Sequence, residues 1–204
     1  WHRAQPDSVK WRLETQAGVV AYEGKWKCIA PGFAPAMSGF RAQYGPLVRQ
    51  VRDFLRVPEE LIYATLATES SGKPNAIRCE PGFISDKTTP QRISVGLMQL
   101  LISTARDVAR RLPQIGVAPE DITRDWLLRP ENNLVVGTGL IFLQATKTQF
   151  DPPLVAASYN AGGLYRDGAE GNPWKLRCYP IGTGAHISRY TGWFNTAWLA
   201  EGAA

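Results

Sequence analysis

The stretch Ala64-Thr-Leu-Ala-Thr-Glu69-Ser-Ser-Gly72 decides the fold, because it has the pattern of an apolar helix that ends on a carboxylate. Side chains three and four residues apart share one helix face. The residues at that spacing here are Leu61, Thr65, Leu66 and Glu69. An acid in this position has two interpretations. It either tilts to the helix end and stays in water, or it is held in an apolar setting for a chemical purpose.

The rest of the chain predicts a mainly α fold (α+β) with a small N-terminal β-hairpin. Alternating apolar and polar residues over 9–14 and β-branched residues over 18–22 indicate its two strands. Apolar residues at helical spacing predict helices over 40–55, 58–69, 103–112, 132–150, 154–161 and 186–201, with a short turn at 125–128. Residues 73–95 show neither pattern, and irregular segments of that length are often functional.

Composition narrows the class of protein. With 204 residues, of which 44% are hydrophobic and 20% charged, the chain fits a folded globular domain. The net charge of +5 is scattered, without the basic stripe of a nucleic-acid binder, so we expect no nucleic-acid partner. No run approaches the ~20 apolar residues of a membrane span. The start, Trp1-His-Arg-Ala-Gln-Pro, shows no export signal, and we expect a processed chain or a part of a longer one.

Metal and redox chemistry find little support in the sequence. The cysteines Cys28, Cys79 and Cys178 lie far apart and form no CxxC pair. The histidines His2 and His186 each stand alone, so we interpret both as surface or structural residues. We expect no metal, no cofactor and three reduced thiols, with one disulfide as the open alternative.

Three short motifs follow one another along the chain: Thr68-Glu69-Ser-Ser-Gly72, Gly96-Leu-Met-Gln99 and Ala156-Ala-Ser-Tyr-Asn-Ala-Gly162. Together they resemble the motifs E-S-x-G-x-P, G-L-M-Q and A-A-Y-N-A-G of lytic transglycosylases in the goose-type lysozyme-like superfamily. The last motif departs from its pattern only by Ser158. The resemblance covers residues 45 to 200 or so, and it implies a lysozyme-like helical domain over 41–204 with 1–40 as a hairpin cap or extension.

A narrower resemblance concerns the segments between these motifs. Residues 78–86, 174–177 and 180–184 are similar to the versions found in phage- and prophage-encoded members of the family. Those members are wall-degrading enzymes, some of them carried by the virion. The similarity implies a phage or prophage origin, with the chain as part of a virion or of a larger phage protein.

The superfamily resemblance implies that Glu69 is the catalytic acid, and the sequence offers a physical reason. Breaking a glycosidic bond requires an acid that protonates the leaving oxygen. A carboxyl group does this near neutral pH only when its pKa is raised. Burial on an apolar face and the partial negative charge of a helix C-terminus would both raise the pKa of Glu69.

A second carboxylate is missing from the positions where goose-type lysozymes place one. Those positions hold Pro90 and Leu101 here, which leaves Asp86 in the neighbouring loop as the remaining candidate. If Glu69 acts alone, it first donates its proton and then takes one from the C6 hydroxyl of muramic acid. That hydroxyl closes on C1 of the same sugar, so proximity replaces an activated water.

The other site residues are implied by the resemblance alone. Those expected at the sugar groove are the backbone around Met98, the side chains of Gln99, Tyr159 and Asn160, and, by an approximate match, Tyr190. The family also has a serine before G-L-M-Q that hydrogen-bonds the acid. In this chain Ser94, Thr88 and Thr89 are open candidates for that role.

The sequence therefore predicts a monomeric, cofactor-free peptidoglycan lytic transglycosylase that acts on the bacterial wall from the periplasm or the exterior. It would cleave the β-1,4 bond between N-acetylmuramic acid and N-acetylglucosamine. One alternative is a hydrolase, a goose-type lysozyme or chitinase, with Asp86 as the second carboxylate. The other is an inert wall-binding or virion structural module that retains the fold.

Overall fold

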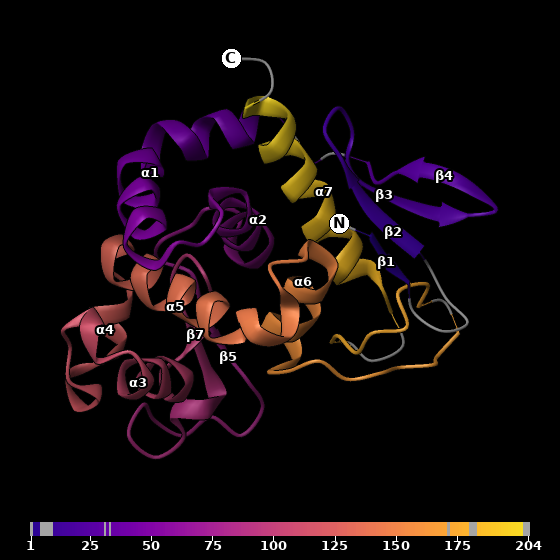
Figure 1. Ribbon diagram of the computed structural model, residues 1–204. Helices are drawn as coiled ribbons and strands as arrows, with labels where there is room; N and C mark the ends of the chain where they lie inside the picture. Colours follow the sequence, from indigo (N-terminus) through magenta and orange to yellow (C-terminus); the bar gives the residue numbers. More distant parts are fainter. Residues whose placement is uncertain are drawn as a thin grey trace.

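The structure is a computed structural model that describes residues 2–4, 10–30, 32, 34–170, 172–179 and 183–201. It confirms a mainly helical fold with small antiparallel sheets (Figure 1). The helices are α1 (Ala34–Leu55), α2 (Glu59–Ser70), α3 (Ile102–Arg111), α4 (Arg124–Leu127), α5 (Pro130–Thr148), α6 (Pro152–Ala161) and α7 (Ala185–Glu201). Short 3-10 turns lie at Pro90–Arg92, Pro113–Ile115 and Pro119–Asp121. Every predicted helix is present, and α1 begins earlier than the predicted residue 40.

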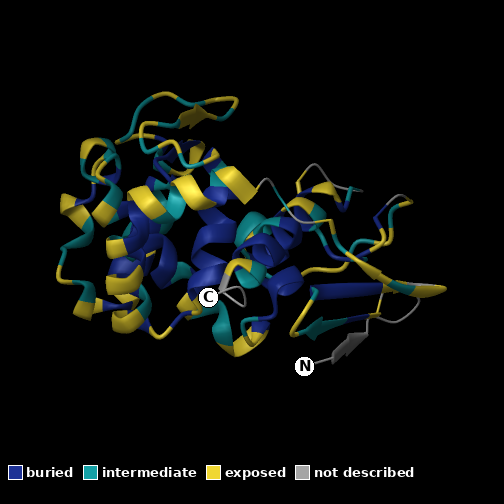
Figure 2. Ribbon diagram, turned by 90° about the horizontal axis from the view of Figure 1, so that it is seen from above, coloured by how far each residue is buried: buried dark blue, intermediate teal, exposed yellow. Residues whose placement is uncertain are grey.

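Helix α2 lies at the centre of the fold, with α1, α6 and α7 packed against it (Figure 1). Nearly all of its side chains are buried, and the helical core around it is buried as well (Figure 2). The predicted apolar face of α2 is buried, and its other side chains are buried as well because α1, α6 and α7 pack around the helix. The small side chains of Ala64 and Ala67 are both buried there and leave room for close helix packing.

Helix α2 ends in a left-handed turn that fixes the direction of Glu69. Ser71 has a φ of 55°, and its N–H donates to the carbonyl of Ala67 at 3.2 Å. The hydroxyl of Ser70 donates to the carbonyl of Leu97 at 2.7 Å. This bond ties the end of the first sequence motif to the second motif, so Glu69 is held beside Gly96–Gln99.

The N-terminal residues form a four-stranded antiparallel sheet in sequential order: β1 (His2–Ala4), β2 (Lys10–Glu14), β3 (Gly18–Glu23) and β4 (Lys25–Cys28). The predicted hairpin corresponds to β2 and β3, with Trp11 opposite Ala21, and two further strands extend it. The sheet lies beside α7 (Figure 1). The side chain of Asn195 accepts from the N–H of Val19 at 2.7 Å and donates to its carbonyl at 3.0 Å. The division into 1–40 and 41–204 stays a prediction, and α1 crosses its boundary.

A second, three-stranded sheet stands where the sequence showed no pattern. Its strands are β5 (Ile77–Cys79), β6 (Ile93–Val95) and β7 (Leu100–Leu101). The expectation of an irregular segment over 73–95 is therefore wrong in part. Strands of two or three residues are too short to show a period of two, so hydrophobic patterning could not reveal them.

Asn133 of helix α5 fixes the loop between β6 and β7. Its buried side chain accepts from the backbone N–H of Met98 at 2.8 Å, and it donates to the carbonyls of Val95 and Leu127 at 2.9 Å each. Gly96 passes close to it with a φ of 78°, and a Cβ there would lie 2.3 Å from the Asn133 amide nitrogen. Only glycine fits this turn, both for its backbone angle and for space.

Two further observations bear on the class of protein. Among the described residues, no helix combines the length and the apolar character needed to cross a membrane. The thiols of Cys28, Cys79 and Cys178 are free, the first two exposed and the third buried. The side chain of His2 lies outside the described residues, as does the 180–182 part of the phage-like segments.

Candidate active site

One cavity, of about 680 Å³, brings together residues from all three sequence motifs. Its lining includes Glu69 from α2, Gln99 from the loop before β7, and Tyr159 and Asn160 from α6. A second cavity, of about 720 Å³, shares Tyr159 and Asn160 with the first. The two cavities therefore adjoin each other at α6.

Glu69 is largely buried in the wall of this cavity. Its side chain retains 16% exposure, so the interpretation of a solvated helix end is wrong. Burial raises the pKa of Glu69 from 4.5 to about 7, although the positive charges of Arg78 and Arg189 oppose the rise. A carboxyl group with that pKa can give up a proton and take one back near neutral pH.

His186, which the sequence predicts to be a surface or structural residue, is buried beside Glu69. Its Nε2 is 3.6 Å from Oε1 of Glu69, and its side chain is 7% exposed. Burial, and then the charge of Arg189, lowers the pKa of His186 to about 4. The contact is not an ion pair near neutral pH, because His186 is uncharged there. At the lower pH where His186 takes up a proton, Glu69 is already protonated. Sequence reasoning missed this residue because a single histidine carries no motif.

The third motif contributes a tyrosine hydroxyl and an amide. The hydroxyl of Tyr159 donates to the backbone carbonyl of Met98 at 2.8 Å. Burial, with the nearby Glu69 charge, raises the pKa of Tyr159, so this hydroxyl keeps its proton. The side-chain oxygen of Asn160 accepts from the backbone N–H of Tyr179 at 2.6 Å. Asn160 therefore holds Tyr179 at the cavity.

The second motif lies at the cavity through its backbone and through one side chain. Met98 has a fully buried side chain, and its carbonyl is the group that meets Tyr159. Gln99 has a φ of 47°, and its amide nitrogen donates to the carbonyls of Gly96 at 2.9 Å and Ala76 at 3.1 Å. Within the part of the chain that the structure describes, these are the hydrogen bonds of the Gln99 side chain, and its oxygen is the group that we expect to meet a ligand.

Tyr190 is not among the described residues that line the cavity. It is 1% exposed, and its hydroxyl donates to the carbonyl of Leu61 at 3.0 Å and lies 3.2 Å from the hydroxyl of Thr65. The side chain therefore joins α7 to the middle of α2, in the core. Burial, and then the negative charge of the nearby Glu69, raises the pKa of Tyr190, so its hydroxyl keeps its proton.

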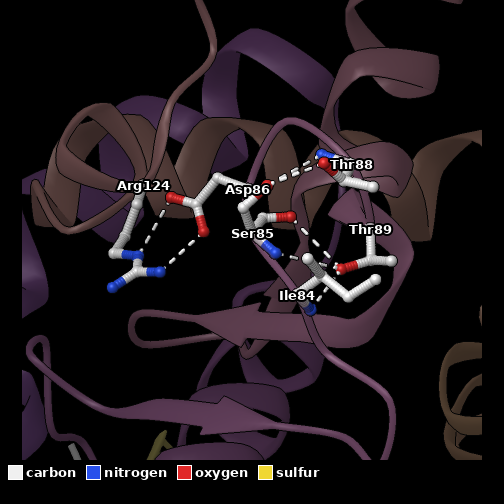
Figure 3. A network of polar contacts seen from close by, with 6 residues as sticks. All are labelled: Ile84, Ser85, Asp86, Thr88, Thr89 and Arg124. Atoms are coloured by element: carbon white, nitrogen blue, oxygen red, sulfur yellow. Dashed lines mark hydrogen bonds and ion pairs between the residues drawn. The ribbon is translucent and has the colours of Figure 1, made fainter.

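Asp86 is engaged outside the cavity. Its two carboxylate oxygens accept from Nε and Nη2 of Arg124, at 3.0 and 2.6 Å (Figure 3). It is not among the described residues that line the cavity of Glu69. Asp86 therefore anchors its loop, between β5 and β6, to α4.

Of the three candidates for the hydroxyl near the acid, Ser94 alone lines the cavity within the described chain. Thr89 instead accepts from the N–H groups of Ile84 and Ser85, at 2.9 and 3.4 Å (Figure 3). Thr88 accepts from the Ser85 hydroxyl at 3.0 Å. The two threonines shape the loop, and Ser94 on β6 faces the site.

A second carboxylate, Glu80, lines the same cavity as Glu69. Its side chain is 37% exposed and pairs with Nη2 of Arg78 at 2.8 Å. The sequence does not mark Glu80 as a site residue, because its place at the cavity depends on the path of a loop and not on a motif. The two acids differ in environment, since Glu69 is buried and Glu80 is exposed and paired.

A mainly helical domain with a buried glutamic acid of raised pKa in the wall of a cavity has the features of enzymes that cleave glycosidic bonds. The comparison with family models names the family. Residues 47–173 match the model described as the transglycosylase SLT domain, and the chain belongs to this family.

Two solved structures are similar to this chain over part of its length. One is an inactive mutant of the lytic transglycosylase Slt from Pseudomonas aeruginosa, with 20% identity, a TM-score of 0.47 and coverage of 60% of this chain. The other is the 70 kDa soluble lytic transglycosylase from Escherichia coli, with 23% identity, a TM-score of 0.46 and coverage of 58%. The match spans 17% of each of those proteins. No curated protein matches the chain.

Proposed function

We propose that this chain is a peptidoglycan lytic transglycosylase that cuts the β-1,4 bond between N-acetylmuramic acid and N-acetylglucosamine. The observation that carries the proposal is the setting of Glu69, which is buried in the cavity wall with a pKa of about 7. Membership of the transglycosylase SLT domain family supports the same reaction. The adjoining second cavity extends the site in the way that a polymeric glycan requires.

In the proposed reaction Glu69 acts first as an acid and then as a base. Its proton passes to the glycosidic oxygen as the bond from that oxygen to C1 of the muramic acid breaks. The carboxylate then takes the proton of the C6 hydroxyl, and the C6 oxygen bonds to C1. The product is a 1,6-anhydro sugar, no water is consumed, and Glu69 ends protonated as it began.

The pH dependence follows from the acid role of Glu69. Because the reaction starts from the protonated carboxyl, kcat/KM is expected to hold its maximum below about pH 7 and to fall tenfold per pH unit above it. The measurement is the release of soluble muropeptides from isolated peptidoglycan between about pH 5 and pH 9, at constant ionic strength. Activity that increases through pH 7 would show that Glu69 acts only as a carboxylate.

Glu80 provides the sharpest comparison with a hydrolase. An exposed carboxylate in the same cavity could activate a water, and Glu80→Gln would then abolish cleavage. The transglycosylase proposal instead expects Glu80→Gln to retain activity within about tenfold, because proximity replaces the base. The assay is muropeptide release, with Asp86→Asn as the matched acid-to-amide control outside the cavity. Mass spectrometry of the products should give anhydro ends in the parent and in both variants.

The finer assignments rest on sequence resemblance. Residues 78–86 and 174–177 support a phage- or prophage-encoded enzyme that acts on the wall from the periplasm or the exterior, as a monomer. The inert wall-binding module makes the opposite prediction for catalysis. A wild-type chain that binds peptidoglycan and releases no muropeptide would establish that alternative.

A further inference from the structure

Two residues of α7 form a short chain of contacts that ends on Glu69. Nε2 of His186 lies 3.6 Å from Oε1 of Glu69, and Nδ1 of His186 lies 3.5 Å from Nη2 of Arg189. His186 is buried, whereas Arg189 is exposed and reaches the ring from the surface. The imidazole therefore separates the exposed guanidinium from the buried acid.

The arginine determines which ring nitrogen carries the proton. A guanidinium group only donates hydrogen bonds, so Nδ1 of His186 must accept. In a neutral imidazole the proton then sits on Nε2. With a pKa of about 4, His186 is neutral near pH 7. Nε2 has no hydrogen-bond partner among the described residues. It therefore presents an unpaired N–H toward Glu69.

We propose that His186 is a positioning residue whose Nε2–H donates to the Glu69 carboxylate once Glu69 has given up its proton, and that Arg189 sets the required tautomer. The inference rests on the proposed function, because it assigns the contact to one stage of that reaction. At 3.6 Å the two atoms are just short of a hydrogen bond. A charge-assisted N–H bond to a carboxylate is shorter, so ionisation of Glu69 draws the groups together.

The first turn of α7, like the histidine, stabilises the negative charge of the Glu69 carboxylate. His186 is the second residue of this helix, and backbone N–H groups at a helix N-terminus favour a nearby negative charge. The end of α2 has the opposite effect, because its carbonyls disfavour the carboxylate. Glu69 thus lies between two helix ends, and His186 supplies a side-chain donor on the favourable side.

The other charged and titratable groups around Glu69 do not offer this donor. Those that interact with it electrostatically are Arg78 of β5, Tyr159 of α6, and Tyr190 and Arg189 of α7. Glu80 and Arg92 also line its cavity. Both tyrosine hydroxyls donate to backbone carbonyls, and Arg78 pairs with Glu80. Two arginines of α1 pair with Glu59 at the far end of α2.

Removing the donor should raise the pKa of Glu69, because the bond stabilises only the charged form. One hydrogen bond to a charged group corresponds to a shift of about one pH unit. His186→Phe keeps an aromatic ring without the donor, and His186→Gln keeps a side-chain N–H. We expect the first variant to shift the pKa of Glu69 upward and the second to restore it in large part.

The test is a carbon-13 NMR titration of the Glu69 carboxyl group in the wild type, His186→Phe and His186→Gln. The pKa should increase by about one unit in His186→Phe, and the basic limb of the pH–rate profile should move with it. Arg110→Gln is the control, since this exposed arginine pairs only with the exposed Asp107 among the described contacts. An unchanged Glu69 pKa in His186→Phe would overturn the inference.

Nitrogen-15 NMR of His186 in the wild type shows which ring nitrogen carries the proton, and it tests the inference even if a variant fails to fold. The wild type should carry its proton on Nε2, and Arg189→Ala should increase the share on Nδ1. A wild-type proton on Nδ1 overturns the inference. Neither measurement requires turnover, so a wild type that makes no anhydro product would refute the proposed function and leave the His186 result to stand separately.

Discussion

Glu69→Gln is expected to lower the rate of peptidoglycan cleavage roughly a thousandfold, within the range for loss of a general acid. The amide fills the same space and can neither donate a proton to the leaving oxygen nor accept one from the C6 hydroxyl. Muropeptide release from isolated peptidoglycan measures the loss. Glu131→Gln is the matched control, because this glutamate is exposed on α5 and does not line the described cavity. Equal rates for Glu69→Gln and wild type would remove Glu69 from the mechanism.

The same variant should be more stable than the wild type at high pH. The pKa of Glu69 is about 7 in the folded protein against 4.5 ordinarily, so the unfolded chain loses this proton first as the pH rises. Its contribution to stability is therefore complete below pH 4.5 and is lost as the pH rises to about 7. Above that the difference amounts to about 3 kcal/mol. Urea denaturation should show Glu69→Gln equal to wild type at pH 4 and more stable at pH 8.

Asn133→Leu should have the largest effect on stability, at about 4 kcal/mol. Leucine has a similar volume and leaves three buried backbone groups without their partner: the N–H of Met98 and the carbonyls of Val95 and Leu127. Each unpaired buried group costs about 1–3 kcal/mol. The loop that carries Met98 and Gln99 should also loosen, so activity should fall along with stability.

The neighbouring Asn132 provides the matched control for this prediction. It lies on the same helix, is partly exposed and donates one bond, to the carbonyl of Trp126 at 2.9 Å. Asn132→Leu should therefore cost about 1 kcal/mol. Urea denaturation of both variants at one pH gives the comparison. Equal losses for the two variants would mean that Asn133 does not hold the loop.

The helices were predictable from sequence because each is long enough to show a helical period. Six predicted helices correspond to α1, α2, α3, α5, α6 and α7. The β5–β7 sheet could not be predicted, because its strands are two or three residues long. The extent to which α2 is buried could not be predicted either, since a pattern of apolar residues cannot distinguish one buried face from burial of nearly the whole helix.

The candidate site was predictable where a motif marks it. Glu69, Gln99, Tyr159 and Asn160 share one cavity, as the resemblance implied. Tyr190 was inferred from an approximate match and lies in the core. The residues that were missed, Glu80 and His186, depend on the path of a loop and on where α7 meets α2. Neither is visible in the spacing of residues along the chain.

The central claim is that Glu69 works without an activated water, and cleavage in water labelled with heavy oxygen tests it most directly. Isolated peptidoglycan is digested in that solvent, and the masses of the released disaccharides are measured by mass spectrometry. The account predicts 1,6-anhydro ends with no label, because the C6 oxygen of the sugar itself bonds to C1. Reducing N-acetylmuramic acid ends in place of the anhydro ends would contradict it, with one heavy oxygen when they are analysed before the C1 hydroxyl exchanges with solvent, because a water must then have attacked C1.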